Sequence, residues 1–433
     1  MEEEKTDMKT TFRRTGLALV ALSAAAPAWA QDPVELTFLV DNGPPSVAQA
    51  EALAAAYTEL NPHVTFDIEL RVGSIDGDNL VKTRLATEEM ADIFLYNSGS
   101  LFQALAPTRT IVELTDQPFL DVVSDSFEAV VTADGGVYGV PIGPGFAGGI
   151  MYNRAIYDEL GLEVPLTWDD FMANNAAIDE AGYVPIAQTY GDTWSAQLLV
   201  LGDYFNVEAD SPGFAERYTN NEAKFATDPA ALRSFERLEE AYEAGYFNED
   251  FGAATYDDGI RMIATGEAAH YPILSLAIDP IAEQYPDAVP DIGFFAQPGD
   301  DPDKNGLTIW LPNALYVPQA SENIDEAVDF LAFVASQAGC QAQIDAGQVS
   351  GPYLIEGCQL PEDVPQATRD LVPYFNDSDL NLPALEFLSP VKGPALPQLT
   401  VEVGSGIRSA AEAAAIYDED VKKAAQQLGL PNW

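Results

Sequence analysis

The sequence predicts an α/β fold divided into two lobes that a hinge joins, and three observations predict it. The chain has 433 residues, which is too many for one ordinary domain. Its first part alternates strand and helix patterns as parallel βαβ units do. Residues 143–149 then combine four glycines with one proline, between apolar stretches at 137–142 and 150–152. Because glycine bends freely and proline is stiff, this stretch is expected to connect two packed bodies.

The first lobe begins with a βαβ pattern. Residues 34–38 alternate apolar and polar side chains as a half-buried strand does, and Leu39 and Val40 extend this strand; residues 64–70 alternate in the same way. Between them, Ser46 and Gln49 have the spacing of a capping box that begins a helix. Residues 91–96 form a continuous apolar run, which is typical of a parallel strand covered on both faces. The loops after such strands lie where open α/β sheets bind ligands.

A second set of strands and helices follows the connector. A short strand is expected at 182–187, and Asp228 with Pro229 predicts the start of a helix. Strands at 308–311 and 314–317 are expected to return the chain to the first lobe.

Several segments together resemble a known family. In chain order they are Ala91-Asp92-Ile93-Phe94, Tyr138-Gly139-Val140-Pro141, Tyr152-Asn153, Pro165-Leu166-Thr167-Trp168 and Ala268-Ala269. In order and spacing, they resemble the family 1 extracellular solute-binding proteins, the maltose-binding-protein-like receptors of sugar ABC importers. The resemblance implies a periplasmic binding protein type II fold, in which the chain crosses three times between discontinuous lobes. The expected ranges are 31–142 with about 310–350 for lobe 1, 147–305 with about 354–433 for lobe 2, and about 143–146, 306–309 and 351–353 for the hinge.

The first thirty residues predict a secretory signal peptide. Arg13 and Arg14 precede an apolar run at 16–26, and Ala28-Trp29-Ala30 is a small-x-small cleavage site. We therefore expect cleavage before Gln31 and a periplasmic location. No other stretch reaches the ~18 apolar residues of a membrane-spanning helix, so direct membrane insertion is not expected.

Charge restricts the class of partner. The chain carries 69 acidic and 20 basic residues, a net charge of −49. Such a surface repels nucleic acid and anionic membranes, so neither is an expected partner, and an anionic ligand is disfavoured as well. Two cysteines, Cys340 and Cys358, would pair as a disulfide in an oxidising compartment.

Motifs for catalysis, nucleotide binding and metal binding are absent or incomplete. Gly143, Gly145 and Gly148 spell G-x-G-x-x-G, but an apolar strand follows them where a dinucleotide site needs a helix. Residues 301–306 copy the first half of an EF-hand loop, yet Pro312 stands where its glutamate is required. No cofactor and no metal are therefore expected. With so many acidic residues, some pair meets the spacing of glycosidase carboxylates by chance, so a secreted glycoside hydrolase stays an alternative.

The candidate binding residues are aromatic rings, amides and small polar groups on the predicted cleft loops. A sugar needs flat rings beneath its C–H faces and paired polar groups at its edges. The candidates are Asn42, Asn97, Ser98, Phe146, Asp192, Trp194, Tyr271, Trp310 and Asn313, with Asp41, Tyr204 and His270 as weaker ones. The resemblance places Asn42, Asn97, Phe146 and Trp194 at positions where the family contacts its ligands. One departure is that the first crossing offers Gly145 and Phe146, where maltose-binding proteins offer a charged contact.

The expected function is that of a monomeric, non-catalytic receptor that captures a neutral sugar or oligosaccharide between its lobes. By the resemblance, its partners are that sugar and the permease subunits of an ABC transporter. A binder of a cationic ligand such as a polyamine, using Asp192 or Asp41, stays open as a second alternative.

Overall fold

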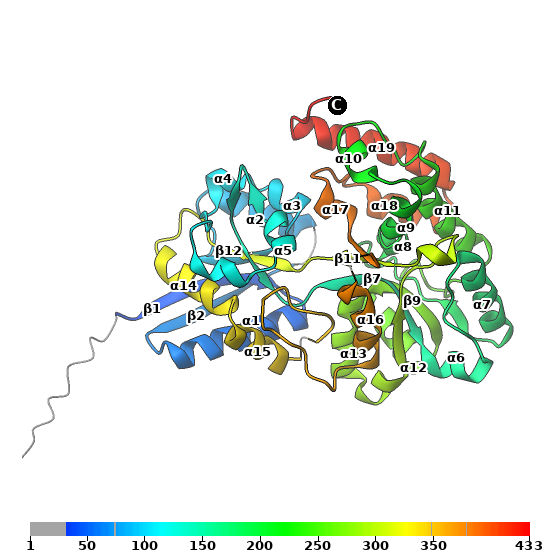
Figure 1. Cartoon of the computed structure of the whole chain (residues 1–433), viewed down its shortest axis with the longest axis horizontal. Helices are drawn as coiled ribbons and strands as arrows, with labels where there is room; N and C mark the ends of the chain where they lie inside the picture. The colour runs from blue at the N-terminus through cyan, green and yellow to red at the C-terminus, as the bar shows by residue number, and fades with distance from the viewer. Residues whose placement is uncertain (1–31, 73–74, 348, 378) are drawn as a thin grey trace, which may run out of the picture.

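The computed structural model describes residues 32–72, 75–347, 349–377 and 379–433. It is an α/β structure of two lobes, each built on its own mixed sheet with helices packed around it (Figure 1). The expected signal peptide, its cleavage site before Gln31 and the motif around it lie outside the described residues. None of the helices within the described ranges has the length and apolar character that crossing a membrane requires.

The first sheet has the order β2-β1-β3-β12-β6. Its strands are β1 (Val34–Asp41), β2 (Val64–Arg71), β3 (Ile93–Tyr96), β6 (Val140–Ile142) and β12 (Asn313–Tyr316). As the βαβ pattern predicts, β1 pairs in parallel with β2 over its whole length and with β3. The strand β12, which arrives late in the chain, pairs antiparallel with both β3 and β6. The carboxyl ends of β1 and β3 therefore meet at one edge of the sheet.

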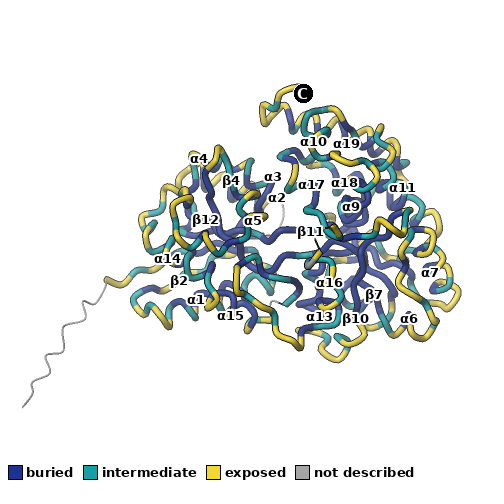
Figure 2. Tube along the Cα trace, in the orientation of Figure 1, coloured by how far each residue is buried: buried dark blue, intermediate teal, exposed yellow. Residues whose placement is uncertain are grey.

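Helices cover this sheet on the outside, and apolar side chains fill the space between. The elements are α1 (Pro44–Leu60), α2 (Ile75–Ala86), α3 (Ser100–Gln103), α4 (Pro107–Thr110), η1 (Pro118–Val122), α5 (Asp125–Val130), α14 (Ile324–Val334) and α15 (Gln337–Asp345), with a two-stranded ribbon of β4 (Thr132–Ala133) and β5 (Gly136–Val137). Phe330 of α14 packs its ring against Phe38, Tyr57 and Phe66 in the core, at centroid distances of 4.8 to 5.8 Å. Figure 2 shows the strands buried and the outer helix faces exposed.

The predicted start of α1 is wrong. The helix begins at Pro44, two residues before Ser46, and Gly43 precedes it without any side-chain cap. Proline suits the first turn of a helix because that turn has no partner for its N–H groups. The consequence is that Ser46 and Gln49 are released from capping and lie within the helix.

The second sheet has the order β13-β11-β7-β9-β8, with β10 added beside the far end of β7. Its strands are β7 (Phe146–Asn153), β8 (Val184–Ile186), β9 (Ala268–Leu274), β10 (Ile292–Phe295), β11 (Leu307–Trp310) and β13 (Asn381–Pro383). The long strand β7 organises this sheet, because it pairs antiparallel with β9 on one side and with β11 and then β10 on the other. Two of its glycines meet neighbours closely: a Cβ on Gly148 would lie 2.2 Å from the Trp310 ring, and one on Gly149 would lie 2.6 Å from the Phe295 carbonyl oxygen.

Many helices surround the second sheet. They are α6 (Arg154–Leu160), α7 (Trp168–Glu180), η2 (Ser195–Gln197), α8 (Leu198–Leu201), α9 (Tyr204–Asp210), α10 (Phe214–Thr219), α11 (Pro229–Glu243), α12 (Tyr256–Thr265), η3 (Ser275–Ala277), α13 (Ile278–Gln284), η4 (Pro286–Asp291), η5 (Pro302–Lys304), α16 (Gln366–Asn376), α17 (Leu385–Leu388), α18 (Leu396–Val403) and α19 (Ala410–Gln427). The expected N-cap of α11 is present, since the Asp228 carboxylate accepts hydrogen bonds from the N–H groups of Ala230 and Ala231.

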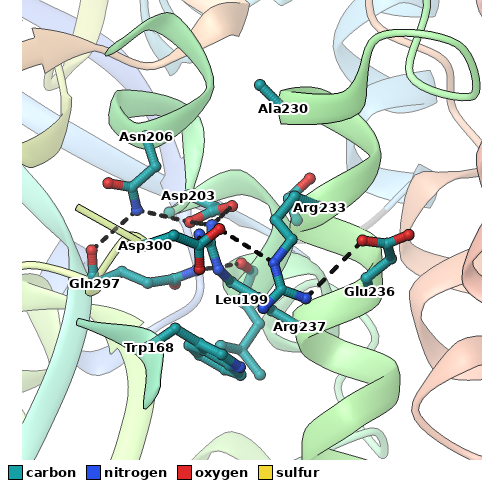
Figure 3. Close-up of polar contacts among 12 residues, drawn as sticks. Trp168, Leu199, Asp203, Asn206, Ala230, Arg233, Glu236, Arg237, Gln297 and Asp300 are labelled. Atoms are coloured by element: carbon teal, nitrogen blue, oxygen red, sulfur yellow. Dashed lines mark hydrogen bonds and ion pairs between the residues drawn. The ribbon is translucent and has the colours of Figure 1, made fainter. Parts of the chain in front are cut away.

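A buried ion network ties the outer helices of the second lobe together (Figure 3). The Arg237 guanidinium of α11 contacts the Asp203 carboxylate at 2.5 Å and the Asp300 carboxylate at 3.1 Å, and both Arg237 and Asp203 are almost completely buried. Asn206 donates a further hydrogen bond of 2.8 Å to Asp203. Partial burial opposes ionisation of Asp300, yet Arg237 and Arg233 outweigh it and lower the pKa of that carboxyl. The network runs from the buried Asp203 and Arg237 to the half-exposed Asp300 and holds second-lobe elements together, which gives it a structural role.

Three segments connect the lobes. The first, residues 143–145, links β6 to β7, and the second, Leu311 and Pro312, links β11 to β12. The second connection thus lies a few residues later than the expected 306–309, most of which belong to β11. The third, residues 349–353, runs along the boundary, and Ile355 just after it still pairs with Val123 of the first lobe.

The expected disulfide is present. Cys340 in α15 and Cys358, just after the third connecting segment, are bonded with their Cα atoms 6.1 Å apart. The bridge therefore fastens one end of that segment to the first lobe.

Candidate functional site

A cavity of about 240 Å³ lies between the lobes, and both contribute to its wall. Since Phe146 is one of its lining residues, we call it the Phe146 cavity. Its lining residues are Pro45, Ser46, Gln49, Leu95, Ile142, Gly143, Phe146, Tyr256, Leu276, Asp279 and Asn313. It stands beside the carboxyl ends of β1 and β3, where open α/β sheets place their ligands.

The first-lobe wall is held in place by a buried glutamine. The Gln343 side-chain oxygen, from α15, accepts a 2.8 Å hydrogen bond from the Gln49 amide and another of 2.8 Å from the Gly143 N–H. All three residues are buried. This one oxygen thereby sets the positions of α1 and of the first connection relative to α15.

The second-lobe wall is formed by Tyr256 and Asp279. Tyr256 is the first residue of α12, which begins with a capping box between Thr255 and Asp258. Its N–H donates a 2.7 Å hydrogen bond to the Asp192 carboxylate. The Trp194 ring lies against the Tyr256 ring at a centroid distance of 5.3 Å. Asp192 and Trp194 therefore contact Tyr256 but do not line the cavity themselves.

The polar groups of the second-lobe wall are incompletely paired. The Tyr256 hydroxyl is buried and, among the described residues, has no hydrogen-bond partner. The Asp279 carboxylate is only 8 % exposed and accepts hydrogen bonds from the Ser350 hydroxyl at 2.7 Å and the Val349 N–H at 3.1 Å. Burial, which these two bonds only partly offset, raises the pKa of Asp279 to about 7. Unpaired polar groups in a hollow are what a polar ligand would satisfy.

A second hollow of about 590 Å³ also lies between the lobes, and it shares no lining residue with the Phe146 cavity. We call it the Phe387 groove, and its lining is Gly99, Ser100, Gln103, Ala129, Val130 and Asp134 from the first lobe, with Glu386, Phe387, Leu388, Ser389, Pro390, Leu428 and Leu430 from the second. Glu386 is engaged by the Trp310 indole N–H and by Lys392, each at 2.5 Å. The lobes come close beside it, since a Cβ on Gly99 would lie 2.8 Å from the Glu386 carbonyl oxygen.

Two of the predicted site residues, Phe146 and Asn313, line the Phe146 cavity. Asn42 is exposed after β1, and Asn97 is half-buried after β3, with its backbone carbonyl accepting a bond from the Tyr316 hydroxyl. Ser98 is buried and donates to the Pro312 carbonyl, which ties the β3 loop to the second connection. These three residues line neither hollow.

Other predicted residues lie in the interior. Tyr271 is 1 % exposed and bonds Thr189, and Trp310 packs flat over Gly148. His270 is fully buried, contacts Tyr157 through one ring nitrogen and Asn175 and Pro185 through the other, and burial lowers its pKa to about 3. An imidazole so enclosed is a core group and makes no ligand contact.

Neither of the remaining weaker candidates, Asp41 and Tyr204, lines a hollow. Asp41 forms an ion pair with Arg71 at 2.9 Å, and Tyr204 is buried and bonds Glu208. The other nine lining residues, among them Gln49, Tyr256, Leu276 and Asp279, were not predicted as binding residues. The capping box at Thr255 could have located Tyr256, but nothing local distinguishes Asp279 from the many other acidic residues.

Comparison with known proteins places these features in context. Residues 42–339 match the family described as bacterial extracellular solute-binding protein. The multiple sugar-binding protein of Streptococcus mutans is 24 % identical over 308 residues, which cover 69 % of this chain and 71 % of that protein. The melibiose/raffinose/stachyose-binding protein of Bacillus subtilis is 24 % identical over 346 residues, which cover 75 % of this chain and 72 % of that protein.

Solved structures agree on the fold. A chitin oligosaccharide binding protein superimposes with a TM-score of 0.78 at 21 % identity, covering 92 % of this chain and all of that one. A solute-binding protein in complex with raffinose gives 0.74 at 21 % identity, covering 91 % of this chain and 99 % of that one. The two-lobe periplasmic binding protein architecture expected from the sequence is therefore confirmed.

Proposed function

Because this chain belongs to the bacterial extracellular solute-binding proteins, a family of binding proteins and not of enzymes, we propose that it captures an oligosaccharide between its lobes and delivers it to the permease of an ABC importer. The single observation that supports this most is the Phe146 cavity, whose walls come from both lobes. The names of the relatives, which refer to multiple sugars, raffinose and chitin oligosaccharides, favour a saccharide.

The lining suits a sugar. Phe146 and Tyr256 offer rings for the apolar C–H faces, while Ser46, Gln49 and Asn313 offer hydroxyl and amide groups for the hydroxyls at the edges. The expected export, cleavage before Gln31 and periplasmic location belong to the same proposal, as does the expectation of a monomer.

Capture follows from linkage between ligand binding and lobe closure. A ligand that touches both walls is held fully only when the lobes are closed, so it shifts the open–closed equilibrium by its difference in affinity for the two forms. A permease that recognises the closed form would then distinguish loaded receptors from empty ones.

The first test is a thermal-shift screen with mono- and oligosaccharides. A ligand at 100 times its dissociation constant should stabilise the folded protein by about 2.7 kcal/mol. X-ray scattering should then show a smaller radius of gyration for the loaded form. If no saccharide shifts the melting temperature, the proposal is wrong.

The second test compares two half-buried phenylalanines. Phe146→Ala removes a ring from the cavity lining and should weaken saccharide binding about tenfold or more, because the lost apolar contact is worth about 1.5–3 kcal/mol. Phe119→Ala removes a half-buried ring of η1 that lines neither hollow and should leave the affinity unchanged. Equal affinities of the two variants by calorimetry would place the ligand elsewhere.

A further inference from the structure

Asp279 is a buried acidic residue that lines a cavity between the lobes. Its carboxylate accepts one hydroxyl and one backbone N–H, and no ion pair with a lysine or arginine accompanies it among the described residues. Asp203 and Asp418 of the second lobe are at least as buried, but Asp203 has Arg237 at 2.5 Å, and Asp418 accepts two backbone N–H groups and lines neither hollow. A buried carboxylate without a cation is costly unless a charged or strongly donating partner joins it.

Among the described residues, Ser350 and Val349 donate to this carboxylate, whereas an ionised carboxylate offers about four lone-pair positions. The neighbouring Tyr256 hydroxyl is buried and has no hydrogen-bond partner among the same residues. The second-lobe wall of the Phe146 cavity therefore places a carboxylate, which the described residues leave with spare acceptor positions, next to the rings of Phe146 and Tyr256.

We propose that the Phe146 cavity selects a saccharide that carries a basic amino group, and that Asp279 receives this group as an ammonium ion. The inference rests on the proposed function and narrows its substrate class. It replaces the neutral sugar expected from composition with an amino sugar or an oligosaccharide containing one. Aromatic rings beside the carboxylate favour the same cation, since their faces attract positive charge.

The surroundings of Asp279 give the selection a pH dependence. The titratable groups that face it are Tyr256 from α12 and Tyr353 from the third connecting segment, and burial raises the pKa of both well above neutrality, so that both stay uncharged. In the empty site, burial raises the pKa of the Asp279 carboxyl to about 7, so this carboxyl is largely protonated below that pH. A cationic ligand must displace that proton, so its affinity should fall about tenfold for each pH unit below 7. Above 7 the affinity should level, and then fall as the ligand's own ammonium loses its proton.

The experiment uses matched pairs of ligands with the full mature protein. Glucosamine, galactosamine and mannosamine are compared with their parent hexoses, and the chitosan trisaccharide with cellotriose, by calorimetry at pH 7.5. In at least one pair, the amino form should bind about 10- to 100-fold more tightly, the range expected for a hydrogen bond to a charged group.

Two substitutions test which carboxylate causes the preference for the amino form. Asp279→Asn keeps the shape of the side chain and should reduce the preference for the amino form to less than about threefold. Glu283→Gln removes an exposed carboxylate from the same helix α13 and should leave the preference intact. If both variants lose the preference for the amino form, the general negative charge of the protein causes that preference, and the inference is overturned.

The outcomes separate this inference from the proposed function. Neutral saccharides that bind without any advantage for the amino forms would overturn the inference and leave the receptor function standing. Stabilisation by a polyamine alone, or by no saccharide at all, would overturn both. If Asp279→Asn does not fold, the pH profile of the unmodified protein decides, because a chitosan trisaccharide affinity that stays flat from pH 5.5 to 7 contradicts the inference.

Discussion

The glycines of residues 143–149 have different physical roles. Gly143 has a φ of +83°, a conformation that other residues adopt only with strain, so the turn requires it. Gly148 and Gly149 lie within β7 and leave room for Trp310 and Phe295. The glycine-rich pattern predicted a connector over this whole stretch, whereas its last four residues belong to a strand.

The steric role of Gly148 predicts a large cost for one added methyl group. Gly148→Ala would place a Cβ 2.2 Å from the buried Trp310 ring and should lower the free energy of unfolding by about 1–3 kcal/mol through overpacking. Gly252→Ala, at an exposed turn where a Cβ meets no atom within 4 Å, is the control and should have almost no effect. Urea denaturation measures both, and equal midpoints would contradict the packing argument.

At the scale of elements, Gln343 of α15 fixes the positions of α1 and of the first connecting segment, which both line the cavity. Gln343→Leu would leave the Gly143 N–H and the Gln49 amide buried without their acceptor, at about 1–3 kcal/mol for each unsatisfied donor. Gln341→Leu on the same helix changes an exposed residue and should stay within about 0.5 kcal/mol of the parent. Both are read from urea midpoints, and a Gln343 variant as stable as its control would show that water replaces the lost acceptor.

The elements whose signals are local could be predicted from the sequence. The parallel pairing of β1, β2 and β3 follows from apolar patterning, and Asp228 caps α11 as the sequence indicates. The start of α1 was wrong because the capping-box spacing also fits residues within a first turn that two prolines already begin.

The cavity itself could not be predicted in the same way. Gln49 meets Gln343 across 294 residues, and Asp279 meets Ser350 across 71, so neither contact has a signature in the neighbouring sequence. The predicted Trp194 and Asp192 are close to the site in space, because both contact Tyr256, but neither lines the cavity. Aromatic residues on the predicted cleft loops therefore locate the region of the site, but they do not identify the residues that line the cavity.

At the scale of the whole molecule, the net charge of −49 opposes compaction. Raising sodium chloride from 0.01 to 0.5 M shortens the screening length and should raise the melting temperature by a few degrees, about 2–4 °C for each kcal/mol of repulsion removed. Potassium chloride should give the same increment, because screening does not depend on the identity of the cation. A constant or falling melting temperature in calorimetry would show that ion pairs such as Arg237 with Asp203 contribute more than the general repulsion.

The third connecting segment lies against the first. The Gly145 N–H donates a 2.7 Å hydrogen bond to the Pro352 carbonyl, and a Cβ on Gly351 would lie only 2.0 Å from the Gly145 carbonyl oxygen. Sliding one segment past the other would break this bond, while flexing both together would preserve it. This contact therefore favours bending of the two segments as a unit, and it opposes a relative slip that would misalign the walls of the cavity.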